Sequence, residues 1–362
     1  MFKHKKILYL TFPILLAACS RHISPAVSTA VTENVVAIKP IVISEKVGFD
    51  SDDPAIWVNP KDASKSLVIG TDKSATGALY VFDLQGKIQH NLVVKGLQRP
   101  NNVDIAYGLK LNGKATDIAI TTERFTHKLR IYSLPDMKPV DNGGIPVFEG
   151  ETAPEYRDLM GIAIYTAKSG KIYAIVGRKT GPKDGSYLWQ YLISDNGSGK
   201  VQAQLVRKFG SYSGKKEIES IAVDNELGYI YYSDEQFGVR QYAADPEKGN
   251  QQLAIFGTTG FAEDHEGISI YKTSANKGYI LVSDQGANRF RIFSREGSSK
   301  DVYNHQLLKI VTVEAGHSDG SEVVNVPLND TFRHGLFVVM SDDRTFHYYR
   351  WEDIAGTDLK VK

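Results

Sequence analysis

The feature that most constrains the fold is a group of three short strand-like runs that recurs six times along the chain. Each run is rich in β-branched and aromatic residues and is bounded by Gly, Asn, Asp or Pro, which is typical of all-β proteins. The first runs of the six groups are Ala55–Val58, Val103–Tyr107, Gly161–Tyr165, Ser220–Val223, Gly267–Tyr271 and Glu322–Val326. Repeats of about 40–50 residues with several strands each indicate a β-propeller.

We therefore predict an all-β chain folded as one six-bladed β-propeller over residues 42–355. The segments between the groups, such as Lys87–Lys95 and Gln202–Phe209, are expected to supply a fourth, outer strand. A sandwich would not be expected to contain six similar groups.

The composition limits the chemistry. The 43 Lys and Arg residues nearly balance the 42 Asp and Glu residues, whereas nucleic-acid binders usually carry a basic excess, so no nucleic-acid partner is expected. The single Cys excludes a disulfide framework, a thiolate zinc site and an iron–sulfur cluster. Any bound metal must use oxygen or nitrogen ligands.

Acidic and amide residues recur just before the first run of each group. In a propeller the first strand of each blade lines the central channel, so these residues should gather at one mouth of it. They are Asp52, Asp53, Asn101, Asn102, Asp104, Asp158, Glu217, Glu219, Asp264, Glu266, Asp319 and Glu322. So many converging carboxylates need a neutralising cation. Ca²⁺, with six to eight oxygen ligands, fits this set.

The ends of the second runs divide the same mouth by charge. In groups one to three they carry Lys73, Arg124, and Arg178 with Lys179, whereas in groups four to six they carry acidic and amide residues. An anionic ligand could bridge the cationic half and cations held by the acidic half. Phosphate suits both, because Lys and Arg match its oxygens and calcium neutralises the remainder.

Several of these segments resemble the β-propeller phytases, in the same order. Asp52-Asp53-Pro54-Ala55-Ile56-Trp57 is similar to a motif of that family. The resemblance continues through Thr71–Lys73, Asn101–Ile105, Glu219–Glu226, Asp264–Tyr271, Ser283–Gly286 and Asp319–Glu322, and it covers about residues 45–355.

The resemblance implies a calcium-dependent phosphatase that acts on phytate, myo-inositol hexakisphosphate, through in-line attack by a calcium-bound water or hydroxide. The calcium ligands it implies are Asp53, Glu219, Glu235, Asp264, Glu266, Gln285 and Asp319. The phosphate-binding cations it implies are Lys73, Arg124 and Lys179, with Arg178 as a neighbouring candidate. We add Asp52, Asn102 and Asp104 to the candidate catalytic residues, and we expect a monomeric enzyme of the 3-phytase type.

Three positions depart from the family pattern. Met160 stands where the family has a Tyr, and the acidic loop before Asp319 is shorter, which weakens Glu314 as a ligand. Asp342-Asp343-Arg344 stands where the family has a longer Asn-containing insertion. These departures bear on activity and substrate preference more than on the fold.

The N-terminus accounts for the cysteine. A basic start precedes the apolar run Ile7–Ala18, which is too short to span a bilayer. Leu16-Ala17-Ala18-Cys19 resembles the lipobox of bacterial lipoproteins, in which the Cys is lipidated after cleavage. We expect a signal peptide over 1–18, a flexible tether over 19–41 and a lipid anchor at Cys19 that holds the protein in the cell envelope, with Ser20 favouring the outer membrane.

Two alternatives remain open from the residues. Six-bladed calcium-dependent lactonases and sugar dehydrogenases share the architecture, although they explain the cationic half of the mouth less well. A non-catalytic propeller that binds phosphorylated ligands is the second alternative.

Overall fold

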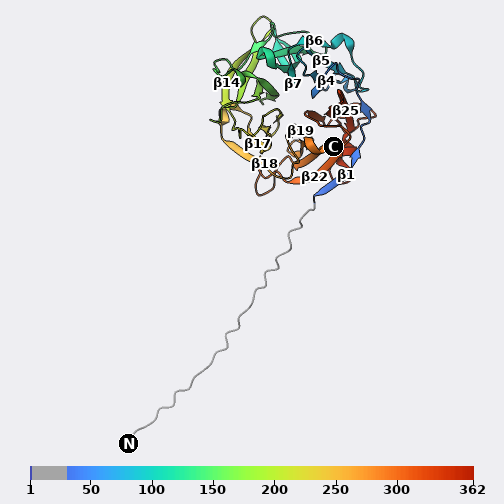
Figure 1. The fold of residues 1–362 in the computed structure, drawn as a ribbon, viewed down its shortest axis with the longest axis vertical. Coiled ribbons are helices and arrows are strands. Elements are labelled where there is room, and N and C mark those ends of the chain that lie inside the picture. The colour runs from blue at the N-terminus through green and yellow to red at the C-terminus, as the bar shows by residue number, and fades with distance from the viewer. Residues whose placement is uncertain (2–30) are drawn as a thin grey trace. The chain divides into compact units, whose positions relative to one another are not determined.

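The strands form six sheets arranged around a centre (Figure 1). The computed structural model describes Met1 and residues 31–362, and the compact unit spans Val31–Lys362. The predicted six-bladed β-propeller is confirmed, and its inner strands begin close to the six predicted positions.

Each blade is a sheet whose strands lie side by side from the channel outward. Blade 1 contains, in that order, β3 (Ser51–Trp57), β4 (Leu67–Asp72), β5 (Gly77–Phe82) and β6 (Val94–Leu97). Blade 2 contains β7 (Pro100–Leu111), β8 (Lys114–Glu123), β9 (Lys128–Leu134) and β10 (Ile145–Pro146). Blade 3 contains β11 (Leu159–Thr166), β12 (Ile172–Arg178), β13 (Leu188–Asp195) and β14 (Val201–Phe209).

Blade 4 contains β15 (Ile221–Asp224), β16 (Tyr229–Asp234), β17 (Gly238–Ala243) and β18 (Gln252–Phe256). Blade 5 contains β19 (His265–Ser274), β20 (Lys277–Asp284), β21 (Arg289–Ser294), β22 (Leu307–Val313) and β1 (Thr32–Ile38). Blade 6 contains β23 (Ser321–Val324), β24 (Leu336–Ser341), β25 (Thr345–Arg350) and β2 (Val42–Ile43).

The helical elements are short. The 3₁₀ turns are η1 (Ala63–Lys65), η2 (His90–Leu92), η3 (Arg124–Thr126), η4 (Pro154–Arg157), η5 (Pro246–Lys248) and η6 (Gln285–Ala287), and α1 spans Trp351–Ala355. Within the described part of the chain, no helix has the length and apolar character needed to cross a membrane.

The core is divided into six apolar clusters, and each lies between two neighbouring blades. In β8, Ile118 and Ile120 pack against blade 3, whereas Ala119 between them packs against blade 1. Successive strand residues point to opposite faces, and here both faces are covered, so the runs are continuously apolar rather than alternating. Each fully buried Ile, Leu or Phe contributes about 1.5–3 kcal/mol relative to an exposed one.

The N-terminal segment closes the ring. Val42 of β2 pairs antiparallel with Tyr348 of β25, so blade 6 takes its outer strand from the start of the chain and its other three from the end. The ring is thus closed by a strand that begins at Val42.

The expected tether over 19–41 is wrong at its C-terminal end. Thr32–Ile38 form β1, which pairs in parallel with β22 and makes blade 5 five-stranded. The backbone groups of β22 at the blade edge would otherwise lack partners, and an extended, Val-rich segment satisfies them. The expected signal peptide, the early part of the tether and Cys19 lie outside the described residues.

Candidate active site at one mouth of the channel

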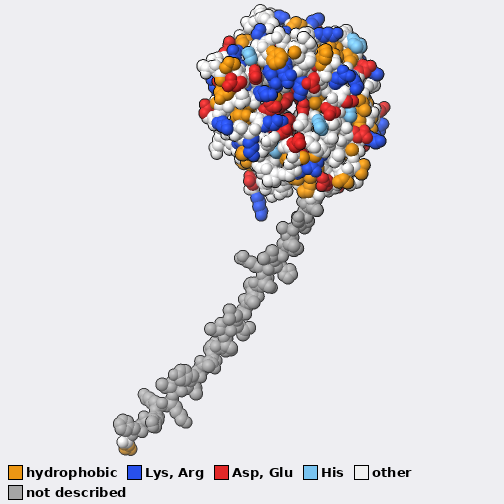
Figure 2. Space-filling view, in the orientation of Figure 1, with side chains coloured by type: hydrophobic (Ala, Val, Ile, Leu, Met, Phe, Trp, Pro, Cys, Tyr) orange, Lys and Arg blue, Asp and Glu red, His pale blue; other side chains and the backbone are white. Residues whose placement is uncertain are grey.

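The starts of the inner strands gather polar side chains at one mouth of the channel. Asp52 lies in β3 and Asn101 in β7, Asp264 directly precedes β19, and Glu219 and Asp319 each lie two residues before an inner strand. Figure 2 shows acidic side chains near the middle of the face drawn, with Lys and Arg side chains beside them.

The inner strands of blades 3 and 4 approach closely at this end. A Cβ on Gly161 of β11 would lie 1.8 Å from the backbone oxygen of Glu219. Only glycine therefore allows the backbone of Glu219 to take its place at the mouth.

The second strands contribute in a fixed register. Their last residues in blades 1 to 5 are buried and structural, namely Asp72, Glu123, Arg178, Asp234 and Asp284. The residues that follow them are the ones turned to the mouth, namely Lys73, Arg124, Lys179, Glu235 and Gln285. Asp234, for example, accepts hydrogen bonds from Arg240 of β17 and from Ser213, which lies between β14 and β15.

Arg178 is accordingly a correction to the predicted site. Its side chain is 0% exposed and pairs with Glu151 at 3.0 Å. Its guanidinium also donates to the backbone oxygens of Tyr156, Ser186 and Tyr187 at 2.8–3.0 Å. Its donors are engaged inside blade 3, because it occupies the inward-facing register that acids occupy in four other blades.

A first group of mouth residues surrounds Lys73. The Lys73 ammonium lies 3.0 Å from Asp52 Oδ1 and 2.6 Å from Asp319 Oδ2. Asn101 Nδ2 donates to Asp52 Oδ2 and to Glu219 Oε1, both at 3.2 Å. Burial lowers the pKa of Lys73, but the carboxylates of Asp52, Glu219 and Asp319 outweigh it and raise the pKa overall. Gln285 Nε2 donates to Asp319 Oδ1, which brings blade 5 into the same group.

A second group consists of two carboxylate clusters that share Glu235. Glu217, Glu219 and Glu235 form one, Glu235, Asp264 and Glu266 form the other, and in each the ligand oxygens lie within 4.8 Å of one another. Asp264 Oδ1 also accepts from Gln236 Nε2 at 3.0 Å.

Glu235, which belongs to both clusters, lacks hydrogen-bond donors in the described part of the chain. Among the described residues, neither oxygen of Glu235 accepts a hydrogen bond, although Oε2 lies 3.0 Å from the Lys216 ammonium. Glu266 Oε2 likewise has no hydrogen-bond partner in the described part of the chain. Burial raises the pKa of Glu235 to about 9, with Glu217 adding to the rise, and it raises the pKa values of Glu219 and Glu266. Buried carboxylates are costly unless paired or bound to a cation.

The two remaining predicted cations differ in exposure. Lys179 is half exposed and pairs with Glu217 Oε2 at 3.3 Å. Arg124 is buried, its Nε donates to the backbone oxygen of Leu159 at 2.9 Å, and its Nη2 contacts the Met160 sulfur. Met160, where the family pattern has a Tyr, thus packs directly on a predicted phosphate-binding residue. Glu314 pairs with Lys39 and is not brought into these groups.

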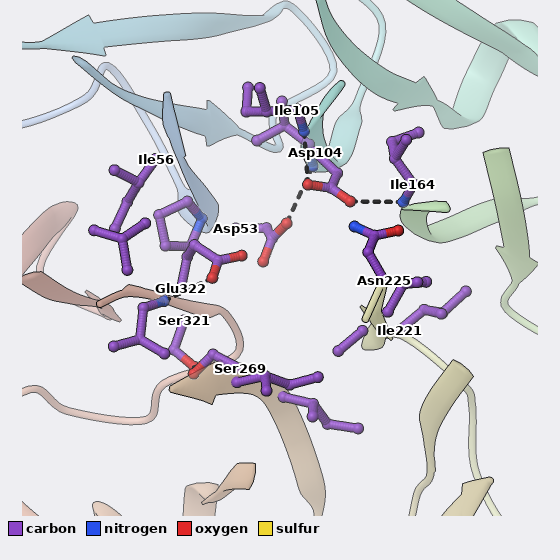
Figure 3. A pocket seen from close by; sticks show the side chains of 18 of the residues that line it. Asp53, Ile56, Asp104, Ile105, Ile164, Ile221, Asn225, Ser269, Ser321 and Glu322 are labelled. Atoms are coloured by element: carbon purple, nitrogen blue, oxygen red, sulfur yellow. Dashed lines mark hydrogen bonds between the residues drawn. The ribbon is translucent and has the colours of Figure 1, made fainter. Parts of the chain in front are cut away.

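Three predicted site residues line the channel cavity next to the mouth groups. Asp53, Asn102 and Asp104 lie around a cavity of about 280 Å³ that also includes Glu322 (Figure 3). Asp53 accepts from the Val103 N–H at 3.1 Å, and Asp104 accepts from the N–H groups of Ile105 and Ile164 at 2.6 and 2.7 Å. Burial raises the pKa of Asp104 to about 7 and that of Glu322 to about 8.

The mouth residues fit a divalent cation of the hard, oxygen-binding kind. Carboxylate oxygens from several strands converge, and some are buried without hydrogen-bond partners in the described chain. Ca²⁺ accepts such oxygens in adaptable geometry. Of the predicted ligands, Glu219, Glu235, Asp264 and Glu266 belong to the two clusters, Asp319 and Gln285 adjoin Lys73, and Asp53 faces the channel cavity.

The structure adds Asn101, which bridges Asp52 and Glu219, and two further residues to the predicted site. Glu217 stands among the acids noted before the inner strands, and it joins the first cluster rather than remaining on the rim. Lys216 reaches Glu235, Asp264 and Glu266. Its only sequence signal is a Lys pair directly before the acidic segment, which a strand pattern does not distinguish from surface charge.

The fold and the mouth define a class of protein: a six-bladed propeller whose mouth can hold metal ions and an anionic ligand. The family model described as phytase matches residues 6–350. A 3-phytase of Bacillus subtilis (strain 168) is 30% identical over 324 residues, which cover 84% of this chain and 80% of that protein. The chain belongs to the phytase family, and at that level it is a phosphatase-type hydrolase.

Proposed function

We propose that this chain is a calcium-dependent phosphomonoesterase of the 3-phytase type that removes phosphate from phytate or other inositol phosphates. One observation carries the proposal. Buried carboxylate oxygens that lack hydrogen-bond partners in the described chain lie at the same mouth as Lys73, Arg124 and Lys179. Family membership supports the same reaction.

In this proposal the acidic residues of the mouth bind the cations and the basic residues bind the phosphate groups. Glu219, Glu235, Asp264 and Glu266 would hold the cations, with Asp53, Gln285 and Asp319 as further candidate ligands. Calcium, when bound, would neutralise phosphate oxygens and acidify a water for attack at phosphorus.

Lys73, Arg124 and Lys179 would bind the phosphate oxygens, with the flat Arg124 guanidinium suited to two of them at once. Asp52 holds the Lys73 ammonium at 3.0 Å and so positions it at the mouth. The Asn101 amide links Asp52 to Glu219 and orients both.

The test is phosphate release from phytate by the purified protein near neutral pH, with calcium or with a chelator. We expect release that depends on calcium and is lost in Glu219→Ala and Lys73→Ala. Absence of calcium-dependent release would refute the proposal. Retained phytate binding without release would identify a binding propeller, and turnover of lactones or sugars instead would identify the other enzyme class.

We also propose that Cys19 carries a lipid anchor that holds a monomeric protein in the cell envelope, at the outer membrane. The run that ends in Leu16-Ala17-Ala18-Cys19 supports this. Labelling with a radioactive fatty acid should mark the wild-type protein and not Cys19→Ala, and equal labelling of both would contradict the anchor. Surface labelling of intact cells gives the orientation, and sedimentation in detergent gives the oligomeric state.

A further inference from the structure

The cluster of Glu235, Asp264 and Glu266 contains an ammonium from the chain itself. Lys216 Nζ lies 3.0 Å from Glu235 Oε2, 2.5 Å from Asp264 Oδ2 and 4.0 Å from Glu266 Oε1. These three carboxylates are one of the two sets whose ligand oxygens converge closely enough for one cation. Lys216 therefore lies where a metal ion in this cluster would lie.

Lys216 enters the cluster from the surface. It belongs to the segment between β14 and β15, which contains no strand, and its side chain is 38% exposed. The side chains of Glu235 and Glu266 are 0% and 4% exposed. The ammonium can thus leave toward solvent by rotation of a flexible side chain, without opening the packed interface between blades.

We propose that Lys216 is a tethered competitor for the divalent cation: its ammonium neutralises this cluster when the cation is absent and is displaced when the cation binds. The inference rests on the proposed function, because it requires a divalent cation to bind at this mouth. The ammonium and a divalent ion cannot share the same oxygens, since the two positive charges would lie within a few ångströms of each other.

The two clusters should then differ in affinity. Of the cluster formed by Glu217, Glu219 and Glu235, Lys216 contacts only Glu235, while the half-exposed Lys179 pairs with Glu217 at 3.3 Å. The cluster with Asp264 and Glu266 has Lys216 against all its members. We expect the first cluster to fill at lower calcium concentration, and Lys216 to set the concentration at which the second one fills.

The first experiment compares calcium binding by the full chain, in detergent, with that of Lys216→Met. Lys215→Met is a matched control, because Lys215 carries the same charge one residue away and its ammonium donates to the Gln236 backbone oxygen instead of a carboxylate. Isothermal titration should show one site about tenfold tighter in Lys216→Met, within the usual range of coupling between ligands. Lys215→Met should leave both affinities unchanged.

Equal calcium affinities in wild type and Lys216→Met would overturn the inference while leaving the proposed function intact. A similar gain in Lys215→Met would also overturn it, because the effect would then be one of general charge. No calcium binding by any of the three proteins would refute the calcium dependence itself.

A second experiment needs no variant and so does not depend on how Lys216→Met folds. Acetylation of wild-type lysines, read by tandem mass spectrometry, should modify Lys216 slowly in chelator and at least about tenfold faster in calcium, because an ammonium paired with carboxylates is a poor nucleophile and the displaced one is exposed. Lys215 should react at the same rate in both. A Lys216 rate that calcium leaves unchanged or lowers would overturn the displacement.

Discussion

Glu235→Gln should stabilise the protein without calcium and weaken its stabilisation by calcium. Burial raises the pKa of Glu235 from its ordinary 4.5 to about 9 in the cation-free fold. Because the pKa of Glu235 is higher in the folded than in the unfolded chain, its contribution to the free energy of unfolding is fully present below about pH 4.5. That contribution is lost as the pH rises toward about 9. At about pH 7.5 the free energy of unfolding is therefore lower by at most about 4 kcal/mol than it would be with an unshifted pKa. This value follows from 1.36 kcal/mol for each of the roughly three pH units above 4.5.

A neutral amide escapes that cost but needs partners for its own N–H groups. We therefore expect Glu235→Gln to gain about 1–4 kcal/mol over wild type in chelator at this pH. In calcium this advantage over wild type should shrink, because the variant lacks the residue that both clusters share. Loss of a site held at 100 times its dissociation constant removes about 2.7 kcal/mol.

Urea denaturation at several pH values, with calcium or chelator, measures both effects. The control is Glu247→Gln, an exposed residue in η5 beyond the other end of β17, which should follow wild type throughout. If Glu235→Gln is less stable than wild type in chelator near pH 7.5, or shows the same pH dependence as wild type, the assignment of a carboxyl group with a strongly raised pKa at this position is refuted.

Three further changes separate the roles assigned above. Lys73→Met should lower kcat for phosphate release in saturating calcium by about 10²–10³, and a rate within a factor of about three of wild type would exclude a role in phosphate binding. Arg178→Met should lower the free energy of unfolding in urea by about 3–5 kcal/mol, because it leaves Glu151 unpaired. The folded fraction should keep its kcat, and an unchanged stability would contradict the structural role. Gly161→Ala should weaken calcium binding and lower the free energy of unfolding by about 1–3 kcal/mol, because the added methyl group clashes with the Glu219 backbone. An unaltered calcium affinity would show that the close contact between Gly161 and this backbone does not position Glu219.

The repeat pattern was sufficient to predict the architecture. Strands such as β8 are covered on both faces, so their apolar runs stand out from the polar turns, and six groups of such runs have few other arrangements. The closing strand β2 begins at Val42, but β1 extends blade 5 back to Thr32, and the sequence does not indicate it. Its pairing with β22 joins residues far apart in the chain, and nothing local to Thr32–Ile38 indicates that partner.

For the candidate site, the sequence indicates which residue types gather at the mouth, but it does not indicate which of two adjacent residues faces the mouth. Arg178 is a buried structural cation, whereas the next residue, Lys179, is turned to the mouth. The sequence of two adjacent basic residues does not show which one faces the mouth until the end of the strand is known. Lys216 could not be predicted, because its role depends on how a loop without strands folds over Glu235 and Asp264.

We propose above all that the carboxylates of the mouth hold divalent cations beside Lys and Arg residues that bind phosphate. Anomalous diffraction from crystals grown with calcium and phytate tests it most directly. We expect cation peaks within about 2.3–2.6 Å of the carboxylate oxygens of both clusters, with Glu235 shared and a substrate phosphate against Lys73. Cations bound elsewhere, or phytate bound away from this mouth, would contradict it.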